Sequence, residues 1–151
     1  MNMKIKINTA LFKKNIEDTQ VVVQEKLKLG ITALASYCVD NAQKNLTING
    51  SVVTGNLRRS IGFEITGGGD EYQAIIIPKA HTAEGVYYGK YVEYGRPPIF
   101  AKNKPYMTFQ IDGHWVRVKE VKAAPAKPFL APAVEKTSMN ANKIIGEVIN
   151  I

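Results

Sequence analysis

Residues 16–46, IEDTQVVVQEKLKLGITALASYCVDNAQKNL, decide the fold. Their apolar side chains recur at intervals of three, four and seven residues: Ile16, Val23, Leu27, Ile31, Leu34 and Cys38. This spacing places one apolar stripe along one face of an α-helix. The pattern therefore predicts a long amphipathic helix that buries this face, with Cys38 as a small buried thiol.

The predicted helix is longer than a small domain is wide. An N-cap at Asn8 or Thr9 and an end near Leu46 give about 35 residues, or about 50 Å at 1.5 Å per residue. We therefore expect either a break, near Asp18-Thr19 or at Gly30, or a part of the helix that projects towards a partner.

Short elements are predicted on both sides of this helix. Ahead of it, residues 1–10 begin with MNMKIKIN, in which apolar residues alternate with lysines, so that a short strand or an extended arm is expected. After it and a polar loop, residues 54–61 predict a short helix. Thr54 is its expected N-cap, and Leu57 and Ile61 are expected to point inward.

From residue 62 the pattern changes to that of strands. Residues 62–66 and 72–78 predict one antiparallel hairpin, and residues 106–112 and 115–121 predict a second one that turns at Asp112-Gly113. The aromatic-rich segment 86–94, VYYGKYVEY, lies between the two hairpins and is followed by GRPP at 95–98. A last helix is predicted at about 133–149. Pro132 fits its first turn, and its candidate core positions are Val134, Ile144, Ile145 and Val148.

Hairpins between terminal helices predict an α+β fold. In this fold a long N-terminal helix and a C-terminal helix pack on an antiparallel β-sheet built from hairpins. We expect residues 11–151 to form a single domain, after the arm or short strand of residues 1–10. A projecting hairpin is expected at about 104–122.

Composition argues against several classes of protein. The 151 residues include one Cys and two His, too few for a disulfide or a Cys-based zinc site. Neither His81 nor His114 has a suitably spaced partner, and no nucleophile motif or phosphate loop is present. Apolar runs are too short for a membrane helix, and the first residues do not resemble a signal peptide. We expect no catalytic activity, no cofactor, no metal and no membrane partner.

Positive charge is concentrated in one segment. The net charge is +7, and residues 96–127 carry +5 of it through seven cations, Arg96, Lys102, Lys104, Arg117, Lys119, Lys122 and Lys127, against Asp112 and Glu120. Such a segment is either a solvated hairpin face or a contact with DNA or an acidic protein surface.

Three local strings stand out, in this order: TGNLRRSI at 54–61, YGKYVEYG at 88–95 and PAKPFLAPA at 125–133. Together they resemble the small neck protein family of long-tailed bacteriophages, variously called tail-completion, head–tail joining or minor tail proteins. That family has a long N-terminal helix, T-G-x-L-R-x-S, Y-x-x-x-x-E-x-G, P-A-x-P-F-L-x-P-A and a final helix. Two features depart from it: the GRPP sequence at 95–98, and a hairpin at 104–122 that is longer than the family core needs.

The resemblance implies a structural virion protein at the neck or tail end, which would be present in the host cytoplasm during assembly. Such proteins form rings, most often of six copies, around the DNA channel, and act as connectors or terminators between the head-side connector or stopper and the tail tube. DNA would pass through the lumen without being read, and any contact with it would be non-specific.

The strings also supply candidate interface residues. Arg58 and Arg59 suit a carboxylate, and Glu93 is their candidate partner, either within the chain or between subunits. Phe129 and Leu130 form an apolar anchor for the core or for a neighbouring subunit. Aromatic and basic residues complete the set of candidates: Tyr88, Tyr91, Tyr94, Arg96, Lys104, Arg117, Lys119 and Lys122.

A second hypothesis is a basic nucleic-acid-binding module. The cationic segment would contact phosphates, and Tyr106, Phe109 and Trp115 are its candidate stacking groups. No recognition helix or RNA-binding signature accompanies them, so that these aromatics are equally suited to a core.

Overall fold

A computed structural model describes residues 3–6, 20–51, 55–69, 71–82, 85–111 and 113–149. The expected N-cap at Asn8 or Thr9, Thr54 and the turn residue Asp112 lie outside these residues. The elements are β1 (Met3–Lys6), α2 (Gln20–Ile48), α3 (Asn56–Ser60), β2 (Ile61–Gly68), β3 (Glu71–Pro78), α4 (Gly89–Tyr94), β4 (Ile99–Phe100), β5 (Met107–Ile111), β6 (His114–Val118), β7 (Glu120–Val121) and α5 (Leu130–Ile149). The fold is α+β, as predicted.

The long helix α2 follows the predicted stripe: Leu27, Ile31, Leu34 and Cys38 are all buried. Of the two positions considered for a break, Gly30 is wrong, because α2 continues through that residue, and Asp18-Thr19 lies outside the described residues. A Cβ atom at Gly30 would lie 3.4 Å from the Ile149 side chain. The glycine therefore allows α5 to approach α2 closely and does not interrupt the helix.

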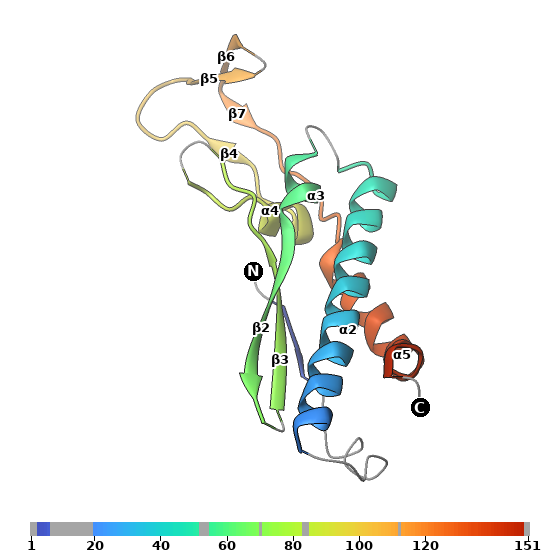
Figure 1. Cartoon of the computed structure of the whole chain (residues 1–151). Helices are drawn as coiled ribbons and strands as arrows, with labels where there is room; N and C mark the ends of the chain where they lie inside the picture. Colours follow the sequence, from blue (N-terminus) through green and yellow to red (C-terminus); the bar gives the residue numbers. More distant parts are fainter. Residues whose placement is uncertain are drawn as a thin grey trace.

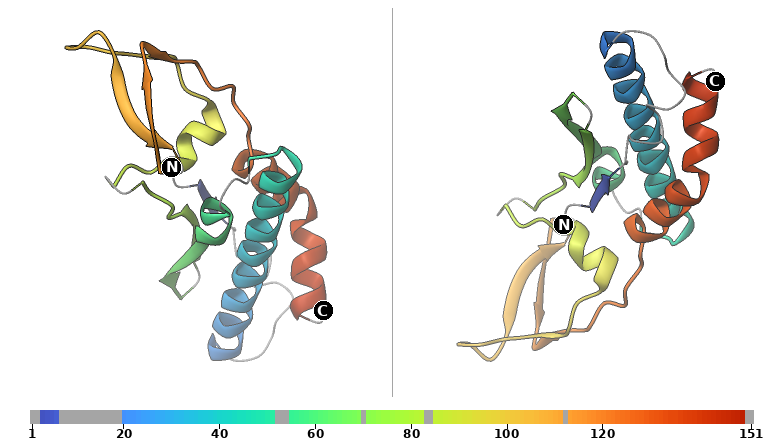
Figure 2. Two further views of the ribbon diagram at one scale, coloured as in Figure 1. Left: turned by 90° about the horizontal axis from the view of Figure 1, so that it is seen from above. Right: turned by 90° about the horizontal axis from the view of Figure 1, so that it is seen from below.

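Three layers form the body of the molecule, with α2 between α5 on one side and a β-sheet on the other (Figures 1 and 2). The sheet has the order β1-β3-β2 and is antiparallel, with Met3 opposite Ile76 and Phe63 opposite Ile76. One core cluster joins α2 to the sheet, and a second joins Leu34 to Ile145 and Ile149 of α5. Helix α2 therefore contributes side chains to both core clusters and connects the sheet to α5.

The first predicted hairpin is confirmed as β2 and β3. In the aromatic-rich segment 86–94, Tyr87 forms an isolated antiparallel bridge with His81, and Gly89–Tyr94 form the helix α4. Gly95, with φ +74°, ends that helix in a conformation that glycine tolerates. The N-cap position of α3 is Gly55, with φ +73°, and not Thr54 as expected.

Residues 96–124 form an extension that we call the arm; it is distinct from the N-terminal arm expected at residues 1–10. It contains two ribbons, β4 paired with β7 and β5 paired with β6, and it projects away from α2 and α5 (Figures 1 and 2). The predicted second hairpin is confirmed as β5 and β6, with Gly113 at φ +81° in the turn. The expected strand 115–121 divides, because Glu120–Val121 leave β6 to pair with β4.

Helix α5 begins at Leu130, a few residues before the predicted start, and holds Pro132 in its first turn as expected. Of the four candidate core positions Ile145 is buried, while Val134, Ile144 and Val148 are half-buried. Leu130, Ala133, Thr137 and Ile149 are also buried, and they bring the start and the end of α5 against the body.

Candidate interaction site

The first turn of α5 is held by a single carboxylate. Glu93, 2% exposed, accepts hydrogen bonds from the backbone N–H groups of Phe129, Leu130 and Ala131, with N–O distances of 2.8, 2.9 and 2.8 Å. Helix N-terminal N–H groups lack partners within the helix, and the helix dipole favours a negative charge there. Glu93 of α4 therefore anchors the start of α5.

Further hydrogen bonds stabilise the same region, in which the ends of α2 and α4 meet the start of α5, and which we call the junction. Asn45 of α2 donates from Nδ2 to the Phe129 carbonyl oxygen at 2.9 Å, and Asn49, in the turn just after α2, donates from Nδ2 to the Lys127 carbonyl oxygen at 3.1 Å. The Lys127 N–H donates to the Val92 carbonyl at 2.8 Å. At Gly95 a Cβ atom would lie 2.7 Å from the Ala124 carbonyl oxygen, so that only glycine fits. The second and third sequence strings thus form one structural unit.

The arm begins and ends at this unit. Arg96 and Ala124 exchange two backbone hydrogen bonds, of 2.9 and 3.0 Å, immediately beyond Gly95. The base of the arm is therefore fixed to the same residues that hold α5. Sequence reasoning missed Asn45, Asn49 and the requirement for Gly95. The only signal for the asparagines was two amides four residues apart at the end of a predicted helix.

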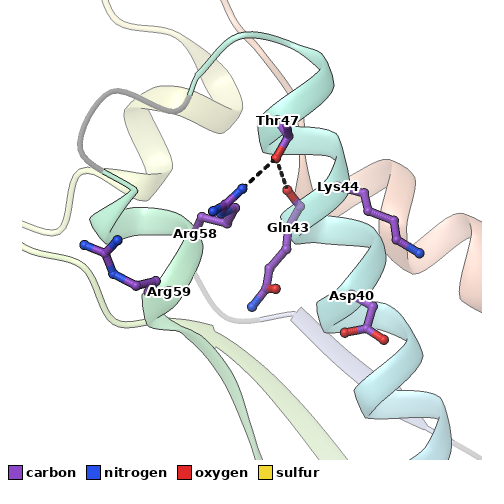
Figure 3. Close-up of a pocket in the computed structure, with 6 residues that line it drawn as sticks. All are labelled: Asp40, Gln43, Lys44, Thr47, Arg58 and Arg59. Carbon is purple, nitrogen blue, oxygen red and sulfur yellow. Dashed lines mark hydrogen bonds between the residues drawn. The ribbon is translucent and has the colours of Figure 1, made fainter.

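Glu93 does not make the arginine contact expected within the chain, because its carboxylate oxygens are directed at the N–H groups of α5. Arg58 instead places Nη1 3.3 Å from Thr47 Oγ1 of α2 (Figure 3). The two arginines line an open hollow of about 500 Å³ between α2 and α3, together with Asp40, Gln43, Lys44 and Thr47. Three cations and one carboxylate there suit an acidic side chain.

One face of the β5–β6 ribbon gathers aromatic and cationic side chains. The register sets Thr108 opposite Arg117 and Gln110 opposite Trp115, so that these residues share a face, and Tyr106 precedes them on it. The Arg117 guanidinium carbon lies 4.3 Å from the centre of the Tyr106 ring, and Lys119 Nζ lies 5.8 Å from it. Trp115 is 72% exposed. We call Tyr106, Trp115, Arg117 and Lys119 the aromatic–cationic face.

The opposite face of the ribbon holds Met107, Phe109, Val116 and Val118, all half-buried. Alternation along both strands therefore sorts the apolar side chains to one side and the exposed aromatic and cationic ones to the other. On the neighbouring ribbon Ile99 and Phe100 are also exposed. The arm thus exposes four large apolar or aromatic side chains among the described residues: Ile99, Phe100, Tyr106 and Trp115.

The remaining candidate residues lie in different places. Phe129 and Leu130 are 0% exposed in the main core of their own chain. Tyr88 packs against that core, whereas Tyr91 and Tyr94 are exposed on α4. Lys104 and Lys122 are exposed in the arm, and Arg96 is half-buried at its base. The candidates therefore divide between the junction and the arm.

Within the described residues, no group of three or more His, Cys, Asp or Glu side chains could hold a metal ion. Among the helices they form, none is both long and apolar enough to cross a membrane.

Burial raises the pKa of the Cys38 thiol, and a hydrogen bond with Thr137 offsets only part of that increase. A protonated thiol is a poor nucleophile.

Comparison with known proteins identifies the class of the chain. The family model described as "Bacteriophage HK97-gp10, putative tail-component" matches residues 10–95. Because this match spans more than half of the chain, the protein belongs to that family and is a phage tail component. The match ends at the last residue before the arm. No curated protein and no solved structure gave a significant match.

Proposed function

We propose that the chain is a structural subunit of the phage neck, which joins head to tail or completes the tail. Six copies would form a ring around the DNA channel. Membership of the tail-component family supports this role. The observation that carries it is the arm, which projects from a three-layered body and is fixed at its base (Figure 1). In a closed ring the body of each copy would contact its two neighbours through two different faces, and the projecting arm would remain available for a different virion protein.

In this role the partners are further copies of the chain, the head-side connector or stopper and the tail-tube proteins. The protein would reside in the virion neck or tail end, and in the host cytoplasm before assembly. It would need neither a cofactor nor a catalytic group. The hollow beside Arg58 and Arg59 provides a further place for a carboxylate of a neighbouring subunit.

A nucleic-acid-binding module is the second candidate, and the charge of the arm is the observation in its favour. Six cations and two carboxylates belong to residues 96–124, and the described cations Lys102, Lys104, Arg117, Lys119 and Lys122 are exposed. In a neck ring such a surface could face the DNA in the lumen. Contact with phosphates alone predicts strongly salt-dependent binding without sequence preference.

Charge reversal in the arm tests the proposed role. The variant with Lys104, Arg117, Lys119 and Lys122 all changed to Glu should remain folded, since exposed substitutions usually cost within about 0.5 kcal/mol each. In an infection that supplies only this variant, heads and tails should accumulate unjoined. A matched variant with reversed lysines on α5, Lys136→Glu and Lys143→Glu, should support assembly. Infectious particles at the normal level from the arm variant would contradict the proposal.

Sedimentation and imaging test the ring itself. The mass of the protein should be that of a ring, either in solution or after addition of purified tails. A particle-averaged image of the virion should show the protein as a ring at the neck. A monomer in both conditions, together with an image that lacks such a ring, would contradict the proposed assembly.

A further inference from the structure

The arm has the surface composition of a protein-binding site. Trp, Tyr and Arg are the residues most enriched among those that dominate binding energy in protein interfaces. Trp115, Tyr106 and Arg117 lie together on the aromatic–cationic face, although the body has a core in which such side chains are normally buried. Apolar side chains that stay exposed are unfavourably hydrated in the unbound state. A partner that covers these side chains removes that unfavourable hydration.

Two features of the face are arranged before any partner binds. The stacking of Arg117 on Tyr106 restricts the guanidinium, and the planar guanidinium matches a carboxylate with two parallel hydrogen bonds. The base of the arm is fixed by the Arg96–Ala124 pair and by Gly95. Less conformational freedom is therefore lost on binding, which favours affinity.

Charge and apolar exposure together distinguish between the candidate partners. Duplex DNA would engage the lysines and Arg117, but its phosphate backbone offers no apolar pocket to Trp115, Phe100 or Ile99. A second copy of this chain carries the same net charge of +7 and is a poor match for a cationic face. An acidic surface of a different protein satisfies both the charge and the apolar side chains.

We propose that the aromatic–cationic face binds another virion protein through an apolar pocket that receives Trp115 and a rim of carboxylates that pairs with Arg117 and Lys119. This inference rests on the proposed structural function and adds the partner class and the contact residues. It also assigns a role to the segment that lies beyond the family match. The arm would then determine which partner this tail component joins.

Binding to purified particles tests the proposal. The probes are heads and tails purified from the phage that encodes this chain, grown without the protein. The full-length chain should bind one of these particles, and Trp115→Ala and Arg117→Glu should each weaken that binding at least tenfold. Arg117→Lys keeps the charge but not the planar group, and should lie between wild type and Arg117→Glu. The controls Met139→Ala, at a residue 76% exposed on α5, and Lys136→Glu should bind as wild type does.

Each alternative to this proposal predicts a different outcome of the binding experiment. If wild type binds a particle and both arm variants bind equally well, the assigned face is wrong while the proposed function stands. If wild type binds neither heads nor tails, both are contradicted. If Arg117→Glu abolishes particle binding, Trp115→Ala leaves it intact and duplex DNA competes with it, the arm binds DNA. If the variants change only the mass of the protein in solution, the partner is a second copy.

Discussion

The body buries its apolar side chains, whereas the arm leaves several of its own exposed to solvent. In the body, two clusters bury the stripe of α2 against the sheet and α5, and Phe129 is completely enclosed. In the arm, two-stranded ribbons leave Ile99, Phe100 and Trp115 exposed. Isolated two-stranded ribbons are marginally stable. The difference indicates that the body supplies most of the folding free energy, whereas the arm presents exposed side chains held in place by its base, as the proposed contact role requires.

The largest expected effect compares one substitution in the two regions. Phe129→Ala should lower the free energy of unfolding by about 3–5 kcal/mol, because it leaves a cavity in the core. The same change at Phe100, which is 58% exposed in the arm, should cost less than about 1 kcal/mol. Urea denaturation measures both values. Equal losses at the two positions would remove the distinction between body and arm.

Glu93 gives the second effect. Glu93→Ala leaves three N–H groups at the start of α5 without their acceptor, and should cost about 3 kcal/mol. Glu93→Gln keeps one acceptor oxygen and should cost about half as much. Glu120→Ala, which removes an exposed carboxylate of the arm, serves as the matched control in the same urea measurement. A loss below 1 kcal/mol for Glu93→Ala would show that the junction does not depend on this carboxylate.

Removal of the arm should have a smaller effect on stability than either change in the body. Arg96 and Ala124 are already paired, so that a two-residue Gly-containing turn can replace residues 97–123. The shortened chain should unfold cooperatively, with a free energy within about 1 kcal/mol of wild type. Calorimetry and urea denaturation provide the measurement. Loss of the cooperative transition would mean that the arm belongs to the folding unit.

The smallest expected effect is the contribution of Cys38 to the pH dependence of the free energy of unfolding. The pKa of Cys38 is raised in the folded chain above the ordinary value of 9.0, because the thiol is buried. As pH rises above about 9, the thiol ionises in the unfolded chain but not in the folded one, so that stability falls. Cys38→Ala should lack this component when unfolding is compared at pH 8 and pH 10. An identical pH dependence in both proteins would contradict the expected burial.

Local patterns in the sequence predicted the elements that depend on local order. The period of the stripe fixed the identity of α2, and alternation with Asp112-Gly113 fixed the β5–β6 ribbon. These signals are contained within one segment of chain. The prediction of a break at Gly30 was wrong because this glycine allows close packing of α5 against α2. The residues of α5 that it contacts are more than a hundred positions away in the sequence.

The junction could not be predicted from such patterns. Glu93 binds groups that lie 36 to 38 residues further along the chain, and Asn45 binds Phe129 across 84 residues. No periodicity marks a hydrogen bond of that kind. The motif strings did identify Glu93 and Phe129, but they paired Glu93 with arginines because charge complementarity is visible in a sequence, whereas the free N–H groups of a helix end are not.

Phage complementation with the arm-shortened chain most directly tests whether the arm is the contact element of a body that folds without it. The variant in which a short turn replaces residues 97–123 would be supplied during infection by the phage grown without its own copy, and infectious particles would be counted. We predict a folded protein and a titre no higher than that without any protein. A titre equal to that given by the wild-type chain would contradict this role for the arm.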